Sequence, residues 1–530
     1  MEPLQHTTPA DVPAVHHLTS ECTPFETSIL KTLLETHGVH LIGDFSGRTA
    51  LSQSGRDFIS AVEQIGCPLE ILDLPLAPDR MPASGRFSDG EFHYQKPQSP
   101  LSVILWNSDI YMDLVRELPL ELFENRRIIG VWYWETEQEL PEFHRRGYDL
   151  VDEVWATTRF IAESFRRHSP VPVHQYPPLN TPLHPPAQDQ WSLPAGIDND
   201  RFVFLFSFDF RSVARRKNPE GLCEAFIRAF PEPAANGPLC VLKSIGGEGR
   251  HALELLELQT RYADRADILF LNGYLPVEQR DSLMARANCY VSLHRSEGLG
   301  LTLMECMSLG KPCIATGYSG NLEFMTPENS WLIPYKKVPV GTGAAPYPPD
   351  HTWAEPDVNA AAAALHEVYT NPSLAAEKGL KGQQTILQDY RLNSVSRRVE
   401  ELLESSLAQP IRPKPALRSI SSTSDDHALL SGRERAYHLL RECKALEALA
   451  RNQRKSLSKR QLSPEVSELI GTLQKITKLQ HQIQSETLRD LGDLKQRLKT
   501  YHSGTLDDLM RDRDLTTSML AQLAKRISSL

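Results

Sequence analysis

The sequence predicts an α/β protein with two doubly wound domains and an added helical region at its C-terminal end. Short apolar runs alternate with amphipathic stretches in two series along the 530 residues, and a proline-rich connection separates the series. A chain of this length exceeds one ordinary domain. In addition, all seven tryptophans precede residue 354. That shift in composition predicts a different architecture for the C-terminal region.

The first series follows an N-terminal extension (1–37) and predicts a domain over residues 38–190. The segment GRDFISAVEQIG (55–66) reads as a helix that ends at Gly66. The expected strands are GVHLIGDF (38–45), LEILDLP (69–75), SVILWN (102–107), RIIGVWYW (127–134) and EVWATT (153–158). Apolar runs of this length, separated by helices, favour a parallel sheet with both faces covered.

The second series follows the proline-rich stretch LHPPAQDQWSLP (183–194) and predicts a domain over residues 195–408. Helices are expected at PEGLCEAFIRAF (219–230) and VEQRDSLMARA (277–287). The expected strands are RFVFLFSF (201–208), PLCVLKSIG (238–246), DILFLNGYL (267–275), CYVSLH (289–294) and KPCIATGY (311–318). Two α/β units of similar size predict two domains that face a cleft.

A proline- and serine-rich linker (409–430) precedes a tail (431–530) that reads as α-helical. Its apolar residues follow a 3-4 spacing, with Gln480 in one apolar position and an interruption near residues 501–504. The stripe comprises Val466, Leu469, Leu473, Ile476, Ile483, Leu491, Leu494, Leu498, Leu515, Met519, Leu523, Ile527 and Leu530. This pattern favours a coiled coil or helical hairpin that assembles copies of the chain or docks a partner protein.

Composition excludes several classes of protein. The formal net charge of -10, from 67 acidic and 57 basic residues, argues against a general nucleic-acid binder. The eight cysteines form no C-x-x-C pair or zinc-type cluster, which is typical of reduced thiols in a cytosolic protein. We identify no signal peptide and no membrane span. The expected location is cytoplasmic, with basic turns at 144–146 and 166–168 available for peripheral contact with the inner face of a membrane.

The stretch SEGLGLTLME (296–305) is the first candidate site. It directly follows the expected strand CYVSLH, so Glu297 lies at a strand's carboxyl end, where ligands bind in open α/β sheets. Gly298 and Gly300 permit close approach of the backbone, and a helix beginning near Thr302 offers free amides to an anion. Amides suit phosphates, whereas Glu297 and Glu305 suit hydroxyl groups. The alternative is a turn into a buried helix with flanking glutamates.

The stretch DFRSVARRKNPEG (209–221) is the second candidate, and it also lies between an expected strand and a helix. Arg211 and Lys217 can converge across this loop, where fixed cations stabilise a leaving diphosphate without a metal. A solvated basic turn is the alternative. A metal-dependent enzyme would need an acidic D-x-D pair at a strand's carboxyl end, whereas Asp198-Asn199-Asp200 precedes its strand. We therefore predict no metal and no cofactor.

Together the two motifs resemble the family 4 glycosyltransferases, which are retaining enzymes of the GT-B fold that use nucleotide-sugar donors. Such enzymes carry a basic pair in the first loop of the second domain and two glutamates with seven residues between them. The resemblance covers roughly residues 38–405 and favours a bacterial branch, whereas the tail is outside it. It extends to NRRIIGVWYWETEQELP (125–141), DEVWATTRF (152–160), LGKPCIATGYSGNLEFM (309–325), ENSWLIPY (328–335) and WAEPDVNAAA (353–362).

This resemblance implies a role for each matching residue of the second domain. Glu305 would bind the donor ribose, and Glu297 would contact hydroxyls of the transferred sugar. Arg211 and Lys217 would neutralise the diphosphate, with Arg216 as an alternative to Arg211. The full set of donor-side positions is Arg211, Arg216, Lys217, Tyr274, Leu275, Glu297, Gly298, Gly300, Leu301, Thr302 and Glu305. Within it, the backbone near Tyr274-Leu275 would hold the base, and the amides from Gly300 to Thr302 would help hold the diphosphate.

The first domain supplies fewer matches. Gly47 would close over the diphosphate from the opposite wall. Many relatives carry a histidine after the strand that corresponds to RIIGVWYW, but this chain has Trp134-Glu135 there. Glu135 would either take a polar role toward the sugar or acceptor, or brace its loop. His294 reads as structural or donor-lining, and GGEGR (246–250) as a surface loop without the spacing of a phosphate-binding motif.

The expected function is transfer of a sugar from a nucleotide donor to a glycan or glycolipid acceptor. The resemblance to the family suggests mannose as the sugar and GDP-mannose as the donor. The expected mechanism is a same-face route in which the diphosphate helps deprotonate the acceptor. Two rivals remain open at this point. One is a nucleotide-sugar epimerase or hydrolase, and the other is an idle GT-B scaffold that organises a glycan-assembly complex through its coiled coil.

Overall fold

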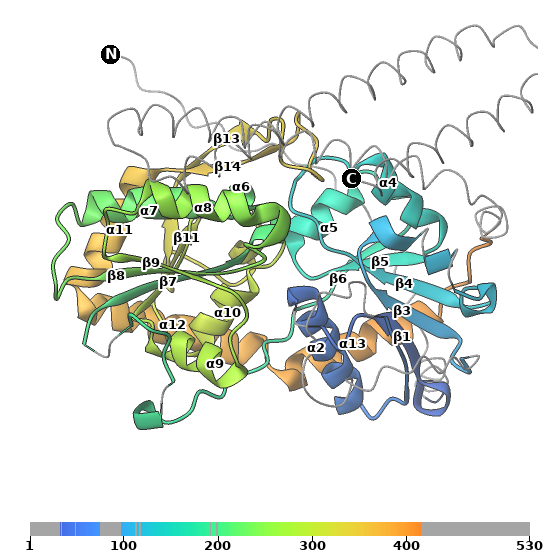
Figure 1. Ribbon diagram of the computed structural model, residues 1–530. Helices are drawn as coiled ribbons and strands as arrows, with labels where there is room; N and C mark the ends of the chain where they lie inside the picture. Colours follow the sequence, from blue (N-terminus) through green and yellow to red (C-terminus); the bar gives the residue numbers. More distant parts are fainter. Residues whose placement is uncertain are drawn as a thin grey trace, which may run out of the picture. The chain divides into compact units, whose positions relative to one another are not determined.

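The computed structural model describes residues 32–414, apart from 33, 48, 75–96, 112–113, 116–117, 191 and 198–199. The chain divides into two units, residues 1–424 and 425–530, and all described residues belong to the first. The predicted coiled coil and most of the N-terminal extension lie outside the described residues. Figure 1 shows two separate sheets, each with helices packed against its faces. The predicted α/β class is confirmed.

The first sheet has six parallel strands in the order β2-β1-β3-β4-β5-β6. Its strands are β1 (Val39–Gly43), β2 (Leu69–Asp73), β3 (Leu101–Leu105), β4 (Arg127–Val131), β5 (Glu153–Ala156) and β6 (Val173–Gln175). The five predicted strands are present, and the short β6 was not predicted. The strand order changes direction between β1 and β3, which marks the point where such sheets bind ligands.

Helix α2 (Ala50–Gln64) connects β1 to β2 and begins five residues before the predicted start. Thr49 is its N-cap, and the Thr49 side chain accepts a hydrogen bond from the backbone amide of Ser52. Small polar residues in the first turns hide the apolar periodicity that would have marked this start. Helix α5 (Arg159–Arg166) is capped in the same way by Thr158. The shorter helical segments before it are η1 (Ser108–Ile110), η2 (Leu120–Leu122), α4 (Glu142–Arg145) and η3 (Arg146–Asp149).

The second sheet has six parallel strands in the order β12-β11-β10-β7-β8-β9. Its strands are β7 (Val203–Asp209), β8 (Leu239–Ile245), β9 (Ile268–Asn272), β10 (Cys289–Ser292), β11 (Cys313–Thr316) and β12 (Trp331–Ile333). The first five match the predicted strands. The order reverses between β7 and β10, so the two candidate motifs, which follow these strands, leave the sheet side by side.

Helices cover both faces of the second sheet, with α7 and α8 on one face and α9 and α10 on the other (Figure 1). The helical segments after η4 (Gln188–Gln190) are η5 (Phe210–Ser212), α6 (Ala214–Lys217), α7 (Pro219–Ala229), η6 (Gly249–His251), α8 (Ala252–Arg261), α9 (Val277–Arg286), α10 (Leu301–Ser308), η7 (Gly320–Glu323), α11 (Val358–Thr370) and α12 (Pro372–Asp389). Within the described part of the chain, no helix combines the length and apolar character needed to cross a membrane.

An antiparallel pair, β13 (Tyr335–Pro339) and β14 (Thr352–Pro356), extends from the second sheet, and we call residues 335–356 the arm. The arm was not predicted because its proline-rich sequence lacks strand alternation. Residues Val340, Tyr347 and Trp353 of the arm are buried in the hydrophobic core of the first domain. The arm therefore joins the two domains.

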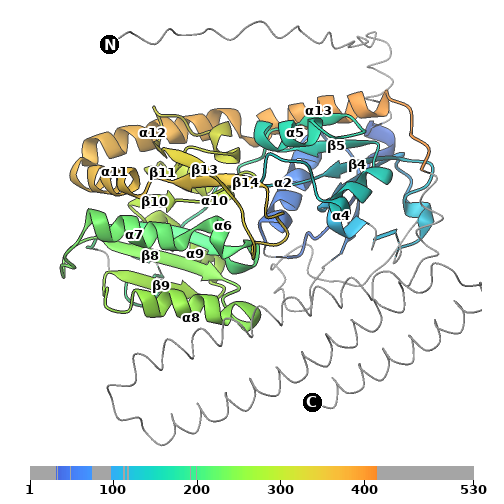
Figure 2. The ribbon, with the colours of Figure 1, turned by 90° about the horizontal axis from the view of Figure 1, so that it is seen from above.

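The last described helix, α13 (Leu392–Leu407), packs against α2 of the first domain (Figure 2). Its residues Val395, Val399 and Leu403 are buried in one cluster with Phe58 of α2. The predicted limits of the two domains, 38–190 and 195–408, stay a prediction. The packing of α13 against α2 nevertheless places the end of the 195–408 segment against the first domain. The six described cysteines are buried and unpaired.

Candidate active site

The topology brings both candidate motifs to one edge of the second sheet. The 209–221 loop follows β7, and the 296–305 turn follows β10, its neighbour at the reversal of strand order. The carboxyl edge of the sheet at such a reversal is the usual ligand site of open α/β folds. The contacts between the two motifs decide whether they form one site.

The turn after β10 is a tightly packed backbone structure. Gly300 has a φ of +89° and is the N-cap of α10, a conformation that side chains disfavour. The amide of Glu297 donates to Ser319 Oγ at 2.8 Å, and the amide of Gly320 donates to the Glu297 carbonyl at 2.9 Å. A Cβ on Gly320 would lie 1.9 Å from the carbonyl oxygen of Gly298. The loop after β11 therefore fixes the backbone that presents Glu297.

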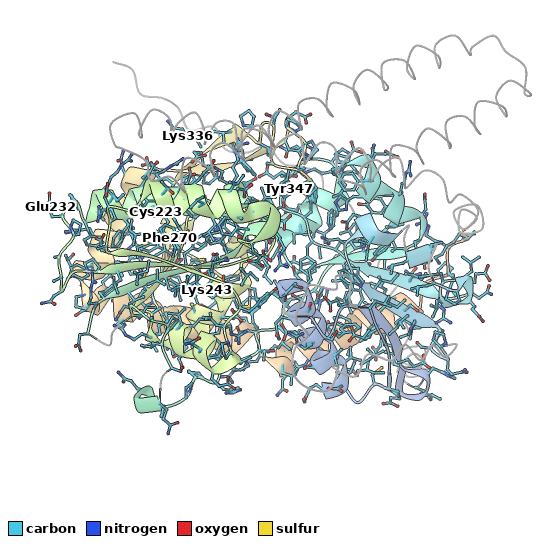
Figure 3. All side chains as sticks on the ribbon, in the orientation of Figure 1. Cys223, Glu232, Lys243, Phe270, Lys336 and Tyr347 are labelled. Atoms are coloured by element: carbon cyan, nitrogen blue, oxygen red, sulfur yellow. The ribbon has the colours of Figure 1, made fainter. Side chains whose placement is uncertain are left out.

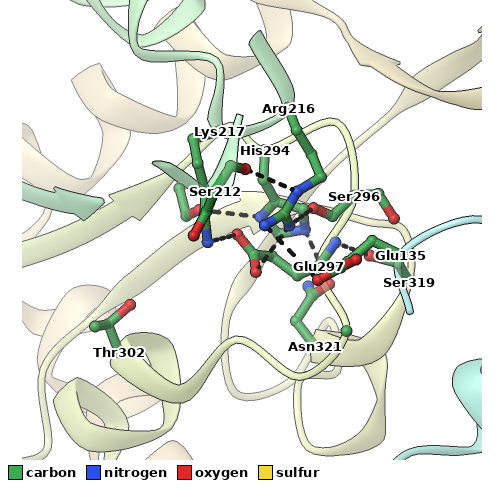
Figure 4. A network of polar contacts seen from close by, with 12 residues as sticks. Glu135, Ser212, Arg216, Lys217, His294, Ser296, Glu297, Thr302, Ser319 and Asn321 are labelled. Carbon is green, nitrogen blue, oxygen red and sulfur yellow. Dashed lines mark hydrogen bonds and ion pairs between the residues drawn. The ribbon is translucent and has the colours of Figure 1, made fainter. Parts of the chain in front are cut away.

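Lys217 and Glu297 meet across the two motifs (Figure 4). Lys217 Nζ lies 2.5 Å from Glu297 Oε1, and Arg216 Nη1 lies 3.3 Å from Glu297 Oε2. Arg216 is only 4% exposed and also donates to the carbonyls of Ser212 and Ser296. One carboxylate thus receives two cations from the neighbouring loop.

Burial and charge act in opposite directions on this cluster. Burial raises the pKa of Glu297, but Lys217 and Arg216 outweigh it and lower that pKa to about 2. Burial lowers the pKa of Lys217, although Glu297 opposes the effect. Burial also acts against the charge of Arg216, yet Tyr347, Glu135 and Glu297 raise its pKa. Glu297 is therefore an ionised acceptor of hydrogen bonds near neutral pH.

Arg211 lies apart from the Glu297 pair. Its Nε donates to Asp209 Oδ1 at 3.0 Å, and its Nη2 donates to the hydroxyl of Tyr274 at 2.8 Å. Its side chain is 22% exposed, in contrast to that of Arg216. Both arginines border the site, but Arg216 contacts Glu297 while Arg211 lies beside the predicted base region at Tyr274. Leu275 is half-buried next to Tyr274.

The loop GGEGR also borders this region. A Cβ on Gly246 would lie 2.7 Å from Asp209 Oδ1 and 2.9 Å from Arg211 Nε. The prediction of a surface loop did not include this contact with Arg211. The glycines of this loop follow the carboxyl end of β8, just as Gly298 and Gly300 follow that of β10. That position was the signal in the sequence.

Glu305 lies in the second turn of α10 and is half-buried. Burial raises its pKa to about 7, while Arg280 opposes that rise. Among the described residues, no hydrogen bond or ion pair to its carboxylate is present. At the start of the same helix, Thr302 Oγ1 accepts from the hydroxyl of Tyr290 at 2.7 Å, and the first-turn amides have no acceptor within the helix.

Gly47 follows β1 at the switch point of the first sheet. Its amide donates to Asp44 Oδ1 at 2.8 Å, and its carbonyl accepts from Arg56 Nη1 at 2.7 Å. A Cβ on Gly47 would lie 2.3 Å from the Asp44 carboxylate. The glycine is thus required by the loop's own packing.

The first domain approaches the turn after β10. Thr158 Oγ1 donates to the Gly298 carbonyl at 2.9 Å, and a Cβ on Gly298 would lie 3.5 Å from the Trp134 carbonyl oxygen. Glu135 Oε1 lies 3.8 Å from Arg216 Nη2. The absence of a side chain at Gly298 therefore allows residues of the first domain to approach this turn closely.

His294 has no exposed surface. Its ring nitrogens contact Ser292 Oγ at 3.0 Å and Asn321 Oδ1 at 3.1 Å, and burial lowers its pKa. These contacts hold the His294 ring inside the second domain. Within residues 32–414, as far as they are described, no group of three or more His, Cys, Asp or Glu residues could hold a metal ion.

Comparison with known proteins identifies the enzyme class. Residues 188–338 match the family model for glycosyl transferases group 1. Residues 188–338, which contain both candidate motifs, are therefore a glycosyltransferase domain. No curated protein matches this glycosyltransferase.

Solved structures resemble the glycosyltransferase in fold. Sucrose-phosphate synthase from Thermosynechococcus elongatus has 16% identity and a TM-score of 0.50, and the match covers 70% of this chain and 99% of that one. A glycosyltransferase from Rickettsia africae has 13% identity, 70% and 99% coverage and a TM-score of 0.47. HepE from Anabaena, in complex with UDP and glucose, has 14% identity, 69% and 99% coverage and a TM-score of 0.45. The first of these shows that the two sheets form the GT-B fold.

Proposed function

We propose that this glycosyltransferase moves a sugar from a nucleoside diphosphate donor to a hydroxyl of a glycan or lipid-linked acceptor, with retained configuration and without a metal ion. The observation that carries the proposal is the meeting of Lys217 and Glu297 at 2.5 Å at the switch point of the second sheet. It gives one site both cations for a diphosphate and an ionised acceptor for sugar hydroxyls.

The donor diphosphate would lie between Arg211, Lys217 and the start of α10. Arg211 is partly exposed and Lys217 is 17% exposed, so both can reach a ligand. The first-turn amides from Leu301 onward would complete the anion site. These fixed donors would stabilise the charge that develops on the diphosphate as it leaves.

The donor ribose would contact Glu305. Its carboxylate has no partner among the described residues, and burial keeps its pKa near neutrality. Two ribose hydroxyls would supply the hydrogen bonds that this group lacks. The base would then lie toward the backbone at Tyr274-Leu275, beside Arg211.

Glu297 would orient the transferred sugar and not attack it. A carboxylate held by Lys217 and Arg216, with a pKa of about 2, is a weak base and so a poor nucleophile. The sugar–diphosphate bond would instead break as the acceptor hydroxyl attacks the same face, and a diphosphate oxygen would take the hydroxyl proton. Gly47 of the first domain would close over the diphosphate.

Product analysis tests the proposal, with GDP-mannose as the first donor and a hydroxyl-bearing glycan as acceptor. NMR should show a new glycosidic bond with the donor's anomeric configuration, and transfer should persist in EDTA. An inverted linkage would contradict the retaining route. Conversion of the donor without acceptor would favour an epimerase or hydrolase, and inertness toward every donor would favour a scaffold.

A further inference from the structure

The arm brings Tyr347 to the edge of the proposed active site. Tyr347 is 7% exposed, and Figure 3 labels it. Its hydroxyl donates to Glu135 Oε2 at 2.7 Å, and its ring centroid lies 5.2 Å from that of Trp134. Tyr347 therefore connects the arm to the loop that follows β4 in the first domain.

Glu135 contacts both Tyr347 and Arg216 and so links the arm to the Glu297 cluster. Its second carboxylate oxygen lies 3.8 Å from Arg216 Nη2, and the other terminal nitrogen of Arg216 lies 3.3 Å from Glu297. Tyr347, Glu135, Arg216 and Glu297 thus form a continuous row, which ends at Lys217. In a buried polar network of this kind, loss of one contact affects the others, because chains of such contacts strengthen one another.

Contacts on both sides hold the arm in place. On the first-domain side, the Thr136 hydroxyl lies 2.9 Å from His351 Nδ1, and Gln138 Nε2 donates to the hydroxyl of Thr352 at 2.7 Å. On the second-domain side, Arg295 pairs with Glu355 of the arm at 2.6 Å. Because these contacts hold the arm to both domains, the position of the Tyr347 hydroxyl is well defined.

We propose that Tyr347 is a positioning residue for sugar transfer, which acts through Glu135 on Arg216 and so sets the orientation of the Glu297 carboxylate. The inference rests on the proposed function. With the hydroxyl in place, Glu135 is held by Tyr347, and Arg216 stays shared with Glu297. Without it, Glu135 turns toward Arg216 and draws the guanidinium away from Glu297.

Kinetics of Tyr347→Phe, Glu135→Gln and the double variant test this inference, with Tyr369→Phe as control. Tyr369 is 37% exposed on α11 and packs against Phe202 and Phe230 of the second domain, which are not members of the row. Tyr347→Phe should lower kcat about 10-fold and leave the donor KM within twofold, because misplacement affects the reacting geometry more than binding. The double variant should match Glu135→Gln alone. An unchanged kcat in Tyr347→Phe, or effects that multiply in the double variant, would overturn it.

Thermal unfolding of the same variants provides a readout that needs no activity. The shifts in Tm of the two single variants should be non-additive in the double variant, because the residues are in contact. Additive shifts would overturn the inference. Absence of transfer by the native chain would instead overturn the proposed function, so the two failures are distinguishable.

Discussion

Lys217 Nζ lies 2.5 Å from Glu297 Oε1, although the two residues are 80 positions apart. Both side chains are largely withdrawn from water, at 17% and 11% exposure. Removal of one partner from such a pair leaves an uncompensated charge, which is costly. The loops after β7 and β10 therefore depend on each other before any donor binds.

Lys217→Met should lower kcat by about 10²- to 10³-fold, as expected for loss of one fixed charge at a leaving group. The reason is that Arg211 alone would face the diphosphate, while Glu297 would keep only Arg216. Steady-state transfer kinetics measure the effect. Lys381→Met, which changes an exposed lysine of α12, is the matched control. A kcat within threefold of the native value would count against the role of Lys217.

Glu305→Gln should stabilise the fold at pH 8 and weaken donor binding. Burial raises the pKa of Glu305 from 4.5 to about 7. The protonated carboxyl group therefore contributes fully to stability below pH 4.5, and that contribution is lost as the pH rises through 7. The neutral glutamine avoids that loss, worth about 1–3 kcal/mol at pH 8. Thermal melts at pH 5 and pH 8 measure the difference, which should be small at pH 5.

Nucleotide titrations at pH 8 complete that test. Loss of charge-assisted bonds to two ribose hydroxyls should weaken nucleoside diphosphate binding by about 10- to 100-fold. Glu377→Gln, on the exposed face of α12, is the control. Equal affinity of Glu305→Gln and the native chain would remove Glu305 from the donor site.

Gly320→Ala should disrupt the turn that presents Glu297, whereas Gly298→Ala should keep the fold. A Cβ at 320 would overlap the backbone carbonyl of Gly298 at 1.9 Å, so the backbone must shift. A Cβ at 298 would lie 3.3 Å from the flexible end of Ile161 and 3.5 Å from the Trp134 carbonyl oxygen, which requires only a small shift of the Ile161 side chain. Melting temperatures and circular dichroism compare the two. A lower Tm for Gly298→Ala than for Gly320→Ala would contradict the geometry.

Much of the fold could be predicted because long apolar strands carry a local signal. All ten predicted strands are present, since runs such as Val203–Asp209 are buried along nearly their whole length. The three-residue strands β6 and β12 were missed because they are too short to show a pattern. The arm was missed because its burial depends on the first domain, which no local pattern reveals.

The site residues that directly follow a long strand could be predicted from the sequence. Glu297 and Lys217 follow β10 and β7, so topology alone brings them together. The different surroundings of Arg211 and Arg216 were not predictable, because both lie in one short loop and only packing separates them. Tyr347 was missed because its contact with Glu135 spans 212 positions, and no local pattern in the sequence reveals a contact of that range.

Lys414→Met in the full chain should lower the free energy of unfolding by about 3 kcal/mol, because it leaves Asp152 buried without its cation. Lys414 Nζ lies 2.7 Å from Asp152 Oδ2, with side-chain exposures of 6% and 0%. Chemical denaturation measures the change, and Lys381→Met is again the control. A change below 1 kcal/mol would contradict the account of this contact.

Deletion of residues 415–530 keeps Lys414 and should therefore leave the Tm and nucleotide binding close to native values. If the predicted helical tail assembles copies of the chain, the same deletion should lower the mass measured by light scattering. A loss of nucleotide binding after this deletion would contradict a modular tail.

The most direct test of the donor site is a thermal shift of the purified chain with GDP, UDP, ADP and dTDP in EDTA, beside Lys217→Ala and Glu305→Ala. A ligand at a hundred times its dissociation constant should stabilise the native chain by about 2.7 kcal/mol. At least one nucleotide should raise the Tm of the native chain and of neither variant. No shift with any nucleotide, or equal shifts in the variants, would contradict a donor site built by Lys217, Glu297 and Glu305.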